Sequence, residues 1–378
     1  MYRAWHSHLS SDNFAARGRF LTPASGIVTL PPVPLPSRHR AAVYTEPGQV
    51  VVDERPVPAV GPHDVLLQVS HCGVCGSDIH FVLEGWGRPG SVEGHEWSGT
   101  VVAVGDAVTA WSVGDAVVGG PSPRCGTCEY CLAGRPSLCD GRSSAGVDVH
   151  PDGAFAEYVV SSERGILRIP EGVSLRHAAL AEPLAVALHG LTRGSVTAGQ
   201  RVLITGGGPI GALSVAAARA RGVDEIVVSE PHPRRRALVE ALGAVAIEPE
   251  ELVTPPSPND VVNDAFDVAL ECSGHPAAME AALGQLRRAG TLVLVGAGIK
   301  RPRFDNNRIL LNELTITGSF VYDADGFERA LELLATPDFP SDLLIEPVDI
   351  PLAGVLDAVR GLHDGDLAGK VMIVPGAK

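Results

Sequence analysis

The sequence has few aromatic residues, few charged residues and no apolar run long enough for a membrane-spanning helix. Aromatic residues make up 5% and charged residues 20% of the 378 residues. The uncharged stretch from Val202 to Ala218 is shorter than the ~20 apolar residues that a spanning helix needs, and glycines near its start interrupt it. This stretch predicts a strand, a turn and a buried helix.

Basic residues are too few for nucleic acid or an anionic membrane surface to be a good partner. Lys and Arg number 30 against 44 Asp and Glu, and the net charge of -14 would repel phosphate groups over most of the surface. The N-terminal residues also lack the apolar core of about 7 to 15 residues that marks a secretory signal. We therefore expect a cytoplasmic protein.

Length and residue pattern predict two domains, because one hydrophobic core stops growing near about 250 to 300 residues. Apolar residues make up 45% of the chain, which is enough to fill two cores. From about residue 40 to 168, short alternating segments broken by Gly, Pro and Asp predict a mostly β half. After about residue 190, apolar strands alternate with Ala-rich helical segments, which predicts a parallel sheet covered on both faces. Residues 1–38 are typical of a flexible extension.

The seven cysteines are clustered and odd in number, unlike those of a disulfide framework. Four of them, Cys125, Cys128, Cys131 and Cys139, follow the spacing Cys-x2-Cys-x2-Cys-x7-Cys. Four thiolates complete the tetrahedral shell of a zinc ion and leave no position open for a substrate. The spacing predicts a structural zinc that holds a loop together; the alternatives are a redox cluster or four unrelated thiols.

A second candidate metal site consists of Cys75, His95 and Glu96, in the strings CGVCGSDIH and EGHEWSG. A catalytic zinc commonly binds one Cys, one His and a further group, and keeps one position open for water or substrate. By residue type alone, two alternatives stay open. Cys72 and Cys75 could form a redox pair, and His95 could be a hydrogen-bonded structural residue.

A glycine-rich turn predicts a dinucleotide site. Gly206-x-Gly208-x-x-Gly211 follows the apolar string RVLITG and precedes an Ala-rich helical segment, and Glu230 ends the next predicted strand. The glycines let a pyrophosphate approach the helix N-terminus, and Glu230 accepts hydrogen bonds from ribose hydroxyls. Glu230 would repel a 2′-phosphate, which favours NAD over NADP. The three arginines that follow could accommodate such a phosphate or could be the solvated start of a helix: Arg234, Arg235 and Arg236.

From about Arg40 to its end, the chain resembles the zinc-dependent medium-chain dehydrogenase/reductase family, most closely its polyol, sorbitol and butanediol dehydrogenases. The resemblance rests on the ordered strings CGVCGSDIH, EGHEWSGTVVAVG, GAFAEYV, AEPLAVALHG, GGGPIG, VSEP and ECSG and on the four-cysteine lobe. It implies an α/β protein with a GroES-like β-rich catalytic domain, residues 39–188 and 325–378. A Rossmann NAD-binding domain with a doubly wound parallel sheet, residues 189–324, is implied between them. A homo-oligomer, dimer or tetramer, is usual in the family.

The resemblance also implies roles around the second metal site. Cys75 and His95 would be ligands of the catalytic zinc, with Asp78 holding the other ring nitrogen of His95. Classical alcohol dehydrogenases have a cysteine at the position of Glu182. Either Glu96 or Glu182 would therefore bind the metal directly, and the other would hold a zinc-bound water. Cys72 has no ligand role in this pattern.

The activity implied is zinc-dependent hydride transfer between a secondary alcohol or polyol and NAD(P), giving a ketone, with two zinc ions per chain. Ser77 would take the alcohol proton and pass it through the ribose hydroxyls to His80, which would release it to solvent, a task that suits an imidazole. Further candidate contacts with the cofactor are Pro209, Ile210, Arg235, Cys272 and Val295.

Two other functions are weighed against this one. A methyltransferase also uses a glycine-rich turn and an acidic residue, but it would not explain the cysteines. A zinc-stabilised nucleotide-binding sensor without turnover would keep every motif and lack only an open substrate pocket. The substrate itself cannot be read from the sequence. Gly85, Trp86 and Arg88 are expected near the mouth of the cleft, and Phe320 and Tyr322 near the domain junction.

Overall fold

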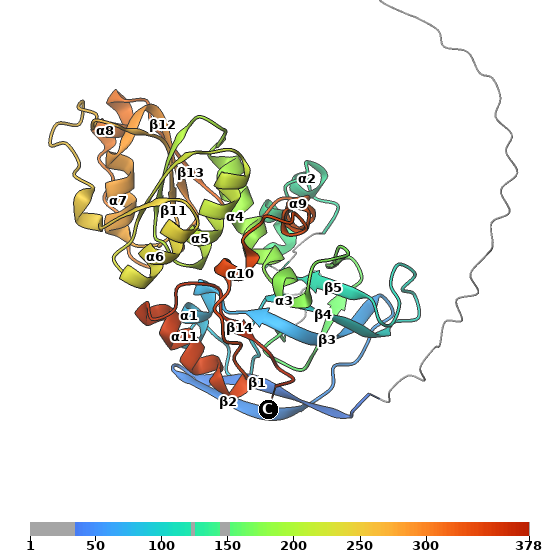
Figure 1. Ribbon diagram of the computed structural model, residues 1–378. Coiled ribbons are helices and arrows are strands. Elements are labelled where there is room, and N and C mark those ends of the chain that lie inside the picture. Colours follow the sequence, from blue (N-terminus) through green and yellow to red (C-terminus); the bar gives the residue numbers. More distant parts are fainter. Residues whose placement is uncertain (1–34, 122–124, 144–151, 378) are drawn as a thin grey trace, which may run out of the picture. The chain divides into compact units, whose positions relative to one another are not determined.

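An antiparallel sheet organises the first half of the chain in the computed structural model, which describes residues 35–121, 125–143 and 152–377 (Figure 1). The strand order is β14-β3-β4-β5-β7, and β6 also pairs with β3. The strands are β3 (Asp64–Gly73), β4 (Glu96–Val104), β5 (Ala116–Gly119), β6 (Tyr158–Ser162), β7 (Ile166–Arg168) and β14 (Met372–Ile373); β1 (Arg38–Glu46) and β2 (Gln49–Pro56) form a separate antiparallel pair. Because β14 pairs with β3, the C-terminal end returns to this half. We call this part the antiparallel lobe.

A six-stranded parallel sheet, the core of the parallel lobe, has the order β10-β9-β8-β11-β12-β13. The strands are β8 (Arg201–Thr205), β9 (Glu225–Ser229), β10 (Val245–Ile247), β11 (Phe266–Glu271), β12 (Leu286–Leu294) and β13 (Thr315–Gly318). The connecting helices are α5 (Pro209–Ala220), α6 (Pro233–Ala241), α7 (Pro276–Gly284) and α8 (Asn306–Leu311). Proline at the first turn of α5, α6 and α7 suits these helix starts, where its missing N–H is not needed. The strand order reverses at β8, which is the switch point of a doubly wound sheet.

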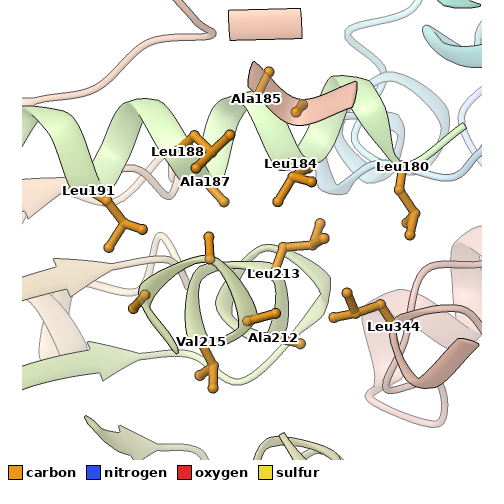
Figure 2. Close-up of a cluster of buried hydrophobic side chains, with 14 of the residues drawn as sticks. Leu180, Leu184, Ala185, Ala187, Leu188, Leu191, Ala212, Leu213, Val215 and Leu344 are labelled. Atoms are coloured by element: carbon orange, nitrogen blue, oxygen red, sulfur yellow. The ribbon is translucent and has the colours of Figure 1, made fainter. Parts of the chain in front are cut away.

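Helix α4 (Ala181–Arg193) packs its apolar face on α5, and their leucines interdigitate in the buried cluster of Figure 2. Leu184, Leu191 and Leu213 are all at most 1% exposed. Truncating such a side chain to alanine costs about 2 to 5 kcal/mol. The other helices are α1 (Gly76–Val82), α2 (Glu129–Leu132), α3 (Leu175–Ala178), α9 (Gly326–Leu334), α10 (Ser341–Leu344) and α11 (Val355–Asp364), with 3-10 turns at Pro136–Leu138, Asp140–Ser143, Pro249–Glu251 and Leu352–Gly354.

The expected fold class is confirmed: a GroES-like antiparallel β domain accompanies a Rossmann parallel sheet. The domain limits remain predictions, and the limit between residues 188 and 189 falls inside α4. Most of the predicted N-terminal extension, residues 1–34, lies outside the described residues. Among the helices that are described, none combines the length and apolar character needed to cross a membrane.

The buried His39 predicts how stability changes with pH. Its ring is 6% exposed, and Nδ1 accepts a hydrogen bond from the Tyr158 N–H at 3.2 Å. Burial lowers its pKa below the ordinary 6.5, so the unfolded chain takes up this proton more readily than the folded chain. The free energy of unfolding should therefore fall as pH decreases through 6.5. His39→Gln, which keeps an acceptor but does not titrate, should lose less stability between about pH 7.5 and about pH 5.5 in urea titrations. An equal loss in both proteins would contradict this.

Candidate active site and metal centres

The four clustered cysteines converge as their spacing predicts. Cys125, Cys128, Cys131 and Cys139 each offer a sulfur, and all four sulfurs lie within 4.8 Å of one another. Backbone N–H groups point at these sulfurs: Cys128 N donates to Cys125 Sγ at 3.2 Å, and Cys128 Sγ caps α2 by accepting from Cys131 N. Four sulfurs at this spacing fit a tetrahedral zinc ion.

The pKa values of these thiols are pushed in opposite directions. The Thr127 N–H is the largest cause that lowers the pKa of Cys125 to about 6, whereas burial raises the pKa of Cys131 to about 12. Four adjacent thiols cannot all ionise without a cation among them, since like charges oppose one another. A divalent ion resolves this conflict, so the donor set fits a structural metal.

The second metal site lies where β3 and β4 end together. Cys75 follows β3 as the N-cap of α1, His95 immediately precedes β4, and Glu96 is the first residue of β4, opposite Gly73. The ligand atoms of Cys75, His95 and Glu96 lie within 4.8 Å of one another. The antiparallel ladder thus brings together residues about twenty positions apart. Cys72 is fully buried and outside this group, as expected.

Glu96 has a partner that sequence reasoning missed. Nζ of Lys370 lies 2.8 Å from each carboxylate oxygen of Glu96, and both side chains are at most 1% exposed. Burial alone would lower the pKa of Lys370, but Glu96, Cys75 and Glu182 together raise it, so the ammonium stays charged. Oε2 of Glu96 accepts no further hydrogen bond within the described part of the chain, so a metal ion bound there would share this carboxylate with the Lys370 ammonium.

Glu182, the other candidate third ligand, lies beside the site without joining the compact ligand group. It sits in the first turn of α4, and a Cβ added at Gly120 would meet both Glu182 Cγ and the carbonyl oxygen of His95. Burial is the main cause that raises the pKa of Glu182 to about 8. The compact ligand group therefore favours Glu96 as the direct third ligand, and the role of Glu182 toward a metal-bound water stays a prediction.

The expected hydrogen bond from His95 to Asp78 is not found, and this expectation is corrected. Asp78 is the third residue of α1, and its Oδ2 accepts the Cys75 N–H at 2.8 Å in a capping box. Its Oδ1 has no hydrogen-bond partner among the described residues. Burial raises the pKa of Asp78 to about 6. The Asp78 carboxylate thus binds the backbone N–H of Cys75 at the start of α1. It acts on His95 through its charge.

The two residues of the predicted proton relay share helix α1. Ser77 Oγ lies 3.4 Å from His95 Nε2, so it borders the metal ligands. His80 lies one turn later; its Nδ1 is 2.7 Å from Glu84 Oε2, and its ring stacks on Trp86 with centroids 4.9 Å apart. Glu84 was not singled out in the sequence, although its i,i+4 spacing from His80 is a readable signal.

The glycine-rich turn has the expected form. Gly206 adopts φ +95°, and a Cβ on Gly211 would lie 1.9 Å from the Gly206 carbonyl oxygen, so neither position accepts a side chain. Glu230 follows β9 and accepts from the Gly207 N–H at 2.6 Å. Pro209 and Ile210 start α5, and Cys272 and Val295 directly follow β11 and β12. These residues therefore gather at the carboxyl edge of the sheet, where dinucleotides bind in such folds.

The three arginines after Glu230 all bind other protein groups, and the Arg234 side chain is also 55% exposed at the start of α6. Arg234 donates to the Asp366 carbonyl and pairs with Glu346, and Arg235 donates to the carbonyls of Leu362 and Leu367. Arg236 pairs with Glu248 at 2.9 Å. Arg234 and Arg235 therefore tie α6 to the C-terminal segment of the antiparallel lobe.

The positions considered for substrate contact are divided. Trp86 is 57% exposed and Phe320 is 55% exposed, whereas Tyr322 is 2% exposed and donates to the Pro121 carbonyl. Gly85 adopts φ +80° in the turn after α1. Tyr322 thus has a structural hydrogen bond at the lobe junction, and the place of Arg88 beside a cleft stays a prediction.

Comparison with known proteins agrees with this geometry. A family model described as the alcohol dehydrogenase GroES-like domain matches residues 61–171, and one described as a zinc-binding dehydrogenase matches residues 209–336. The chain is 35% identical to a sorbitol dehydrogenase of Bacillus subtilis (strain 168) over 359 residues, covering 90% of this chain and 98% of the relative. It is 34% identical to an L-threonine 3-dehydrogenase of Chelativorans sp. (strain BNC1), covering 80% and 89%.

Among solved structures, one described as a zinc-binding dehydrogenase from Sinorhizobium meliloti 1021 bound to NADP has 31% identity and a TM-score of 0.78. The match covers 90% of this chain and all of that chain. The whole two-lobed architecture is therefore shared.

Metal analysis should give two zinc ions per chain, one for each ligand group. Cys75→Ser and Cys139→Ser should each retain about one zinc, because the two groups share no ligand. Cys139→Ser should also lower Tm, since it leaves a loop without its metal. Mild chelation should remove only the Cys75 zinc, whose shell has an open position. Retention of both ions in Cys75→Ser would contradict the second site.

Proposed function

Since the chain belongs to the zinc-containing medium-chain dehydrogenase/reductase family of alcohol dehydrogenases, we propose that it oxidises a secondary hydroxyl of a polyol to a ketone with NAD. The coarser assignment, a zinc-dependent NAD(P) dehydrogenase of the polyol and alcohol type, follows from the family. The observation that carries the proposal is the convergence of Cys75, His95 and Glu96 within 4.8 Å. A zinc ion held there supplies Lewis acidity, which lowers the pKa of a bound hydroxyl.

The chain's own residues would handle the proton. Ser77, beside His95 at 3.4 Å, accepts the proton of the substrate hydroxyl and releases its own toward His80. The pairing of Glu84 with Nδ1 of His80 assigns the ring hydrogen to that nitrogen and leaves Nε2 as the acceptor. The His80 side chain is 17% exposed, so it can return the proton to solvent. Hydride acceptance is the chemistry that a bound nicotinamide supplies.

The preference for NAD rests on Glu230 and on the commitments of the arginines. Glu230 is 2% exposed and directly follows β9 beside the glycine-rich turn, where a 2′-phosphate would meet its charge. Each arginine that could offset this repulsion has other partners, and Arg235 is largely buried by them. The NADP in the similar structure from Sinorhizobium meliloti is therefore no reason to expect NADP in this chain.

A polyol is the proposed substrate because the similar proteins include a sorbitol dehydrogenase, although an L-threonine 3-dehydrogenase is almost as similar. Both substrates carry a secondary hydroxyl, so the reaction class is common to them. A homo-oligomeric, cytoplasmic enzyme remains the expectation from the sequence.

NADH absorbance with C4 diols, sorbitol, xylitol, threonine and simple secondary alcohols should identify at least one polyol substrate. Cys75→Ser should lower kcat by about a hundredfold or more, because the Lewis acid is lost. Cys72→Ser, at a buried sulfur outside the ligand group, is the matched control and should keep its activity. Absence of turnover with every alcohol would instead support the sensor without turnover.

The cofactor preference can be measured by steady-state kinetics. The parent protein should have a higher kcat/KM with NAD than with NADP. Glu230→Gln keeps an acceptor for the Gly207 N–H but removes the charge, so the NAD to NADP ratio should fall by about tenfold. Arg287→Met, which breaks the Asp267 pair at the amino end of β11, is the matched control and should leave the ratio nearly unchanged. A parent that prefers NADP would overturn this assignment.

A further inference from the structure

The backbone around Lys370 is hydrogen-bonded to Leu344 and Glu346. The Lys370 N–H donates to the Leu344 carbonyl at 2.8 Å, and the Glu346 N–H donates to the Lys370 carbonyl at 2.9 Å. Oε1 of Glu346 accepts from the N–H groups of Ala368 and Gly369 at 2.8 and 2.9 Å. Glu346 therefore fixes both the turn before Lys370 and the residue itself.

The same carboxylate faces the parallel lobe. Arg234 of α6 lies 2.7 Å from Glu346 Oε2 and also donates to the Asp366 carbonyl. Glu346 is 8% exposed, so this ion pair is shielded from water on the glutamate side. Glu346 is thus the side chain of this segment that pairs with Arg234 of α6.

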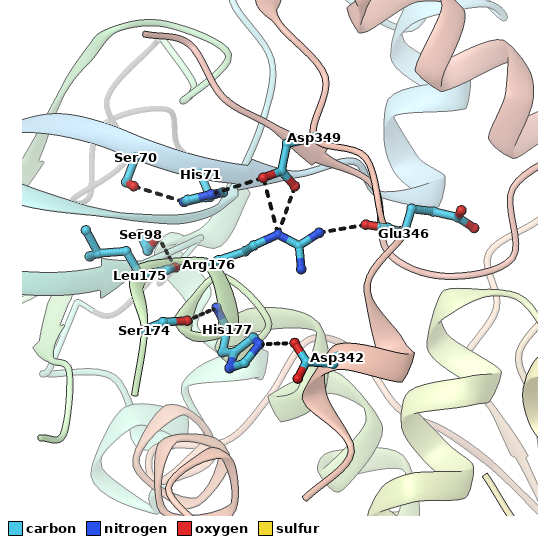
Figure 3. Close-up of polar contacts among 10 residues, drawn as sticks. All are labelled: Ser70, His71, Ser98, Ser174, Leu175, Arg176, His177, Asp342, Glu346 and Asp349. Atoms are coloured by element: carbon cyan, nitrogen blue, oxygen red, sulfur yellow. Dashed lines mark hydrogen bonds and ion pairs between the residues drawn. The ribbon is translucent and has the colours of Figure 1, made fainter. Parts of the chain in front are cut away.

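The main chain of Glu346 is anchored in the antiparallel lobe. Arg176 donates to the Glu346 carbonyl at 2.6 Å and is itself held by Asp349 at 2.9 Å, which lies 3.6 Å from His71 (Figure 3). In Figure 3 the Glu346 side chain extends away from Arg176. One residue thus joins a fixed anchor on one side to α6 on the other.

Lys370 connects this segment to the metal centre through its contact with Glu96. Its Nζ lies 2.8 Å from Glu96 and 3.1 Å from the Val74 carbonyl, and neither charged side chain reaches solvent. A buried carboxylate needs a cation. Two cations compete for Glu96: the ammonium of Lys370 and an ion bound by Cys75 and His95.

We propose that Glu346 is a positioning residue for the metal centre, because it makes the place of Lys370, and hence the share of Glu96 left to the metal, depend on Arg234 of the parallel lobe. This inference rests on the proposed function, which gives Glu96 a role beside a zinc ion. It assigns Arg234 a task at the metal centre in place of phosphate binding.

Because Lys370 and the metal compete for Glu96, the direction of change in the rate of zinc loss can be predicted. Weakening the hold of Lys370 releases Glu96 to the metal, so the catalytic zinc should leave more slowly. Arg234→Met and Glu346→Gln should slow its loss to a chelator by roughly threefold, and Lys370→Met by about tenfold or more. A merely structural loosening of the site would speed the loss instead.

Zinc release is followed with a chromogenic chelator in the full-length zinc protein, without substrate. The cobalt-substituted protein adds a second readout, because its visible bands report the ligands of the metal. The bands of Arg234→Met and Glu346→Gln should move in the direction of Lys370→Met. Arg168→Met, which breaks the Asp115 pair within the antiparallel lobe, is the matched control and should change neither readout.

The double variant Arg234→Met/Glu346→Gln should match the single variants, because both break one link. Additive effects, or release that is unchanged or faster in the single variants, would overturn the proposal. The Arg234 side chain is 55% exposed, so its variant should fold even if Glu346→Gln does not. A parent that binds zinc but oxidises no alcohol would refute the proposed function and leave the release rates to decide this inference.

Discussion

The pairing of β3 with β4 is the constraint on which the metal centre depends. Gly73 lies opposite Glu96, and a Cβ at Gly73 would come within 2.2 Å of Glu96 Oε2 and 3.1 Å of Lys370 Cδ. Only glycine permits the carboxylate and the ammonium to meet over this strand. Two residues later Cys75 starts α1, and on the partner strand His95 precedes Glu96. The register of one ladder therefore sets the distances among the ligands.

This centre concentrates negative charge in a buried place. Asp78, Glu96 and Glu182 are all at most 4% exposed, and burial raises the pKa of Asp78 and Glu182. Carboxylates in such surroundings persist as anions only beside cations. Lys370 provides one positive charge, and the donor set of Cys75, His95 and Glu96 fits a metal that provides the other. The fold thus makes a strong site out of charges that would be unfavourable without these cations.

Three successive arginines show how one helix serves both lobes. Arg236 pairs with Glu248 inside the parallel lobe, whereas Arg234 and Arg235 bind the C-terminal segment that returns to the antiparallel sheet. The helix that follows Glu230 therefore also binds the segment that carries Lys370. Helix α6 therefore links the region of the glycine-rich turn to the metal centre, although the two lie at different sheets.

The sequence by itself determined the features whose residues lie close together along the chain. The four cysteines, the glycine-rich turn between β8 and α5, and the strings around Cys75 and His95 were all readable, because their spacing dictates local geometry. The alternation of strands and helices likewise predicted the two sheets. Tertiary structure alone decided the long-range charge pairs. Lys370 meets Glu96 across 274 positions and Arg234 meets Glu346 across 112. The tertiary structure also favoured Glu96 over Glu182 as a metal ligand. No spacing rule reaches such contacts, because they depend on how two sheets and the returning C-terminal segment pack against one another.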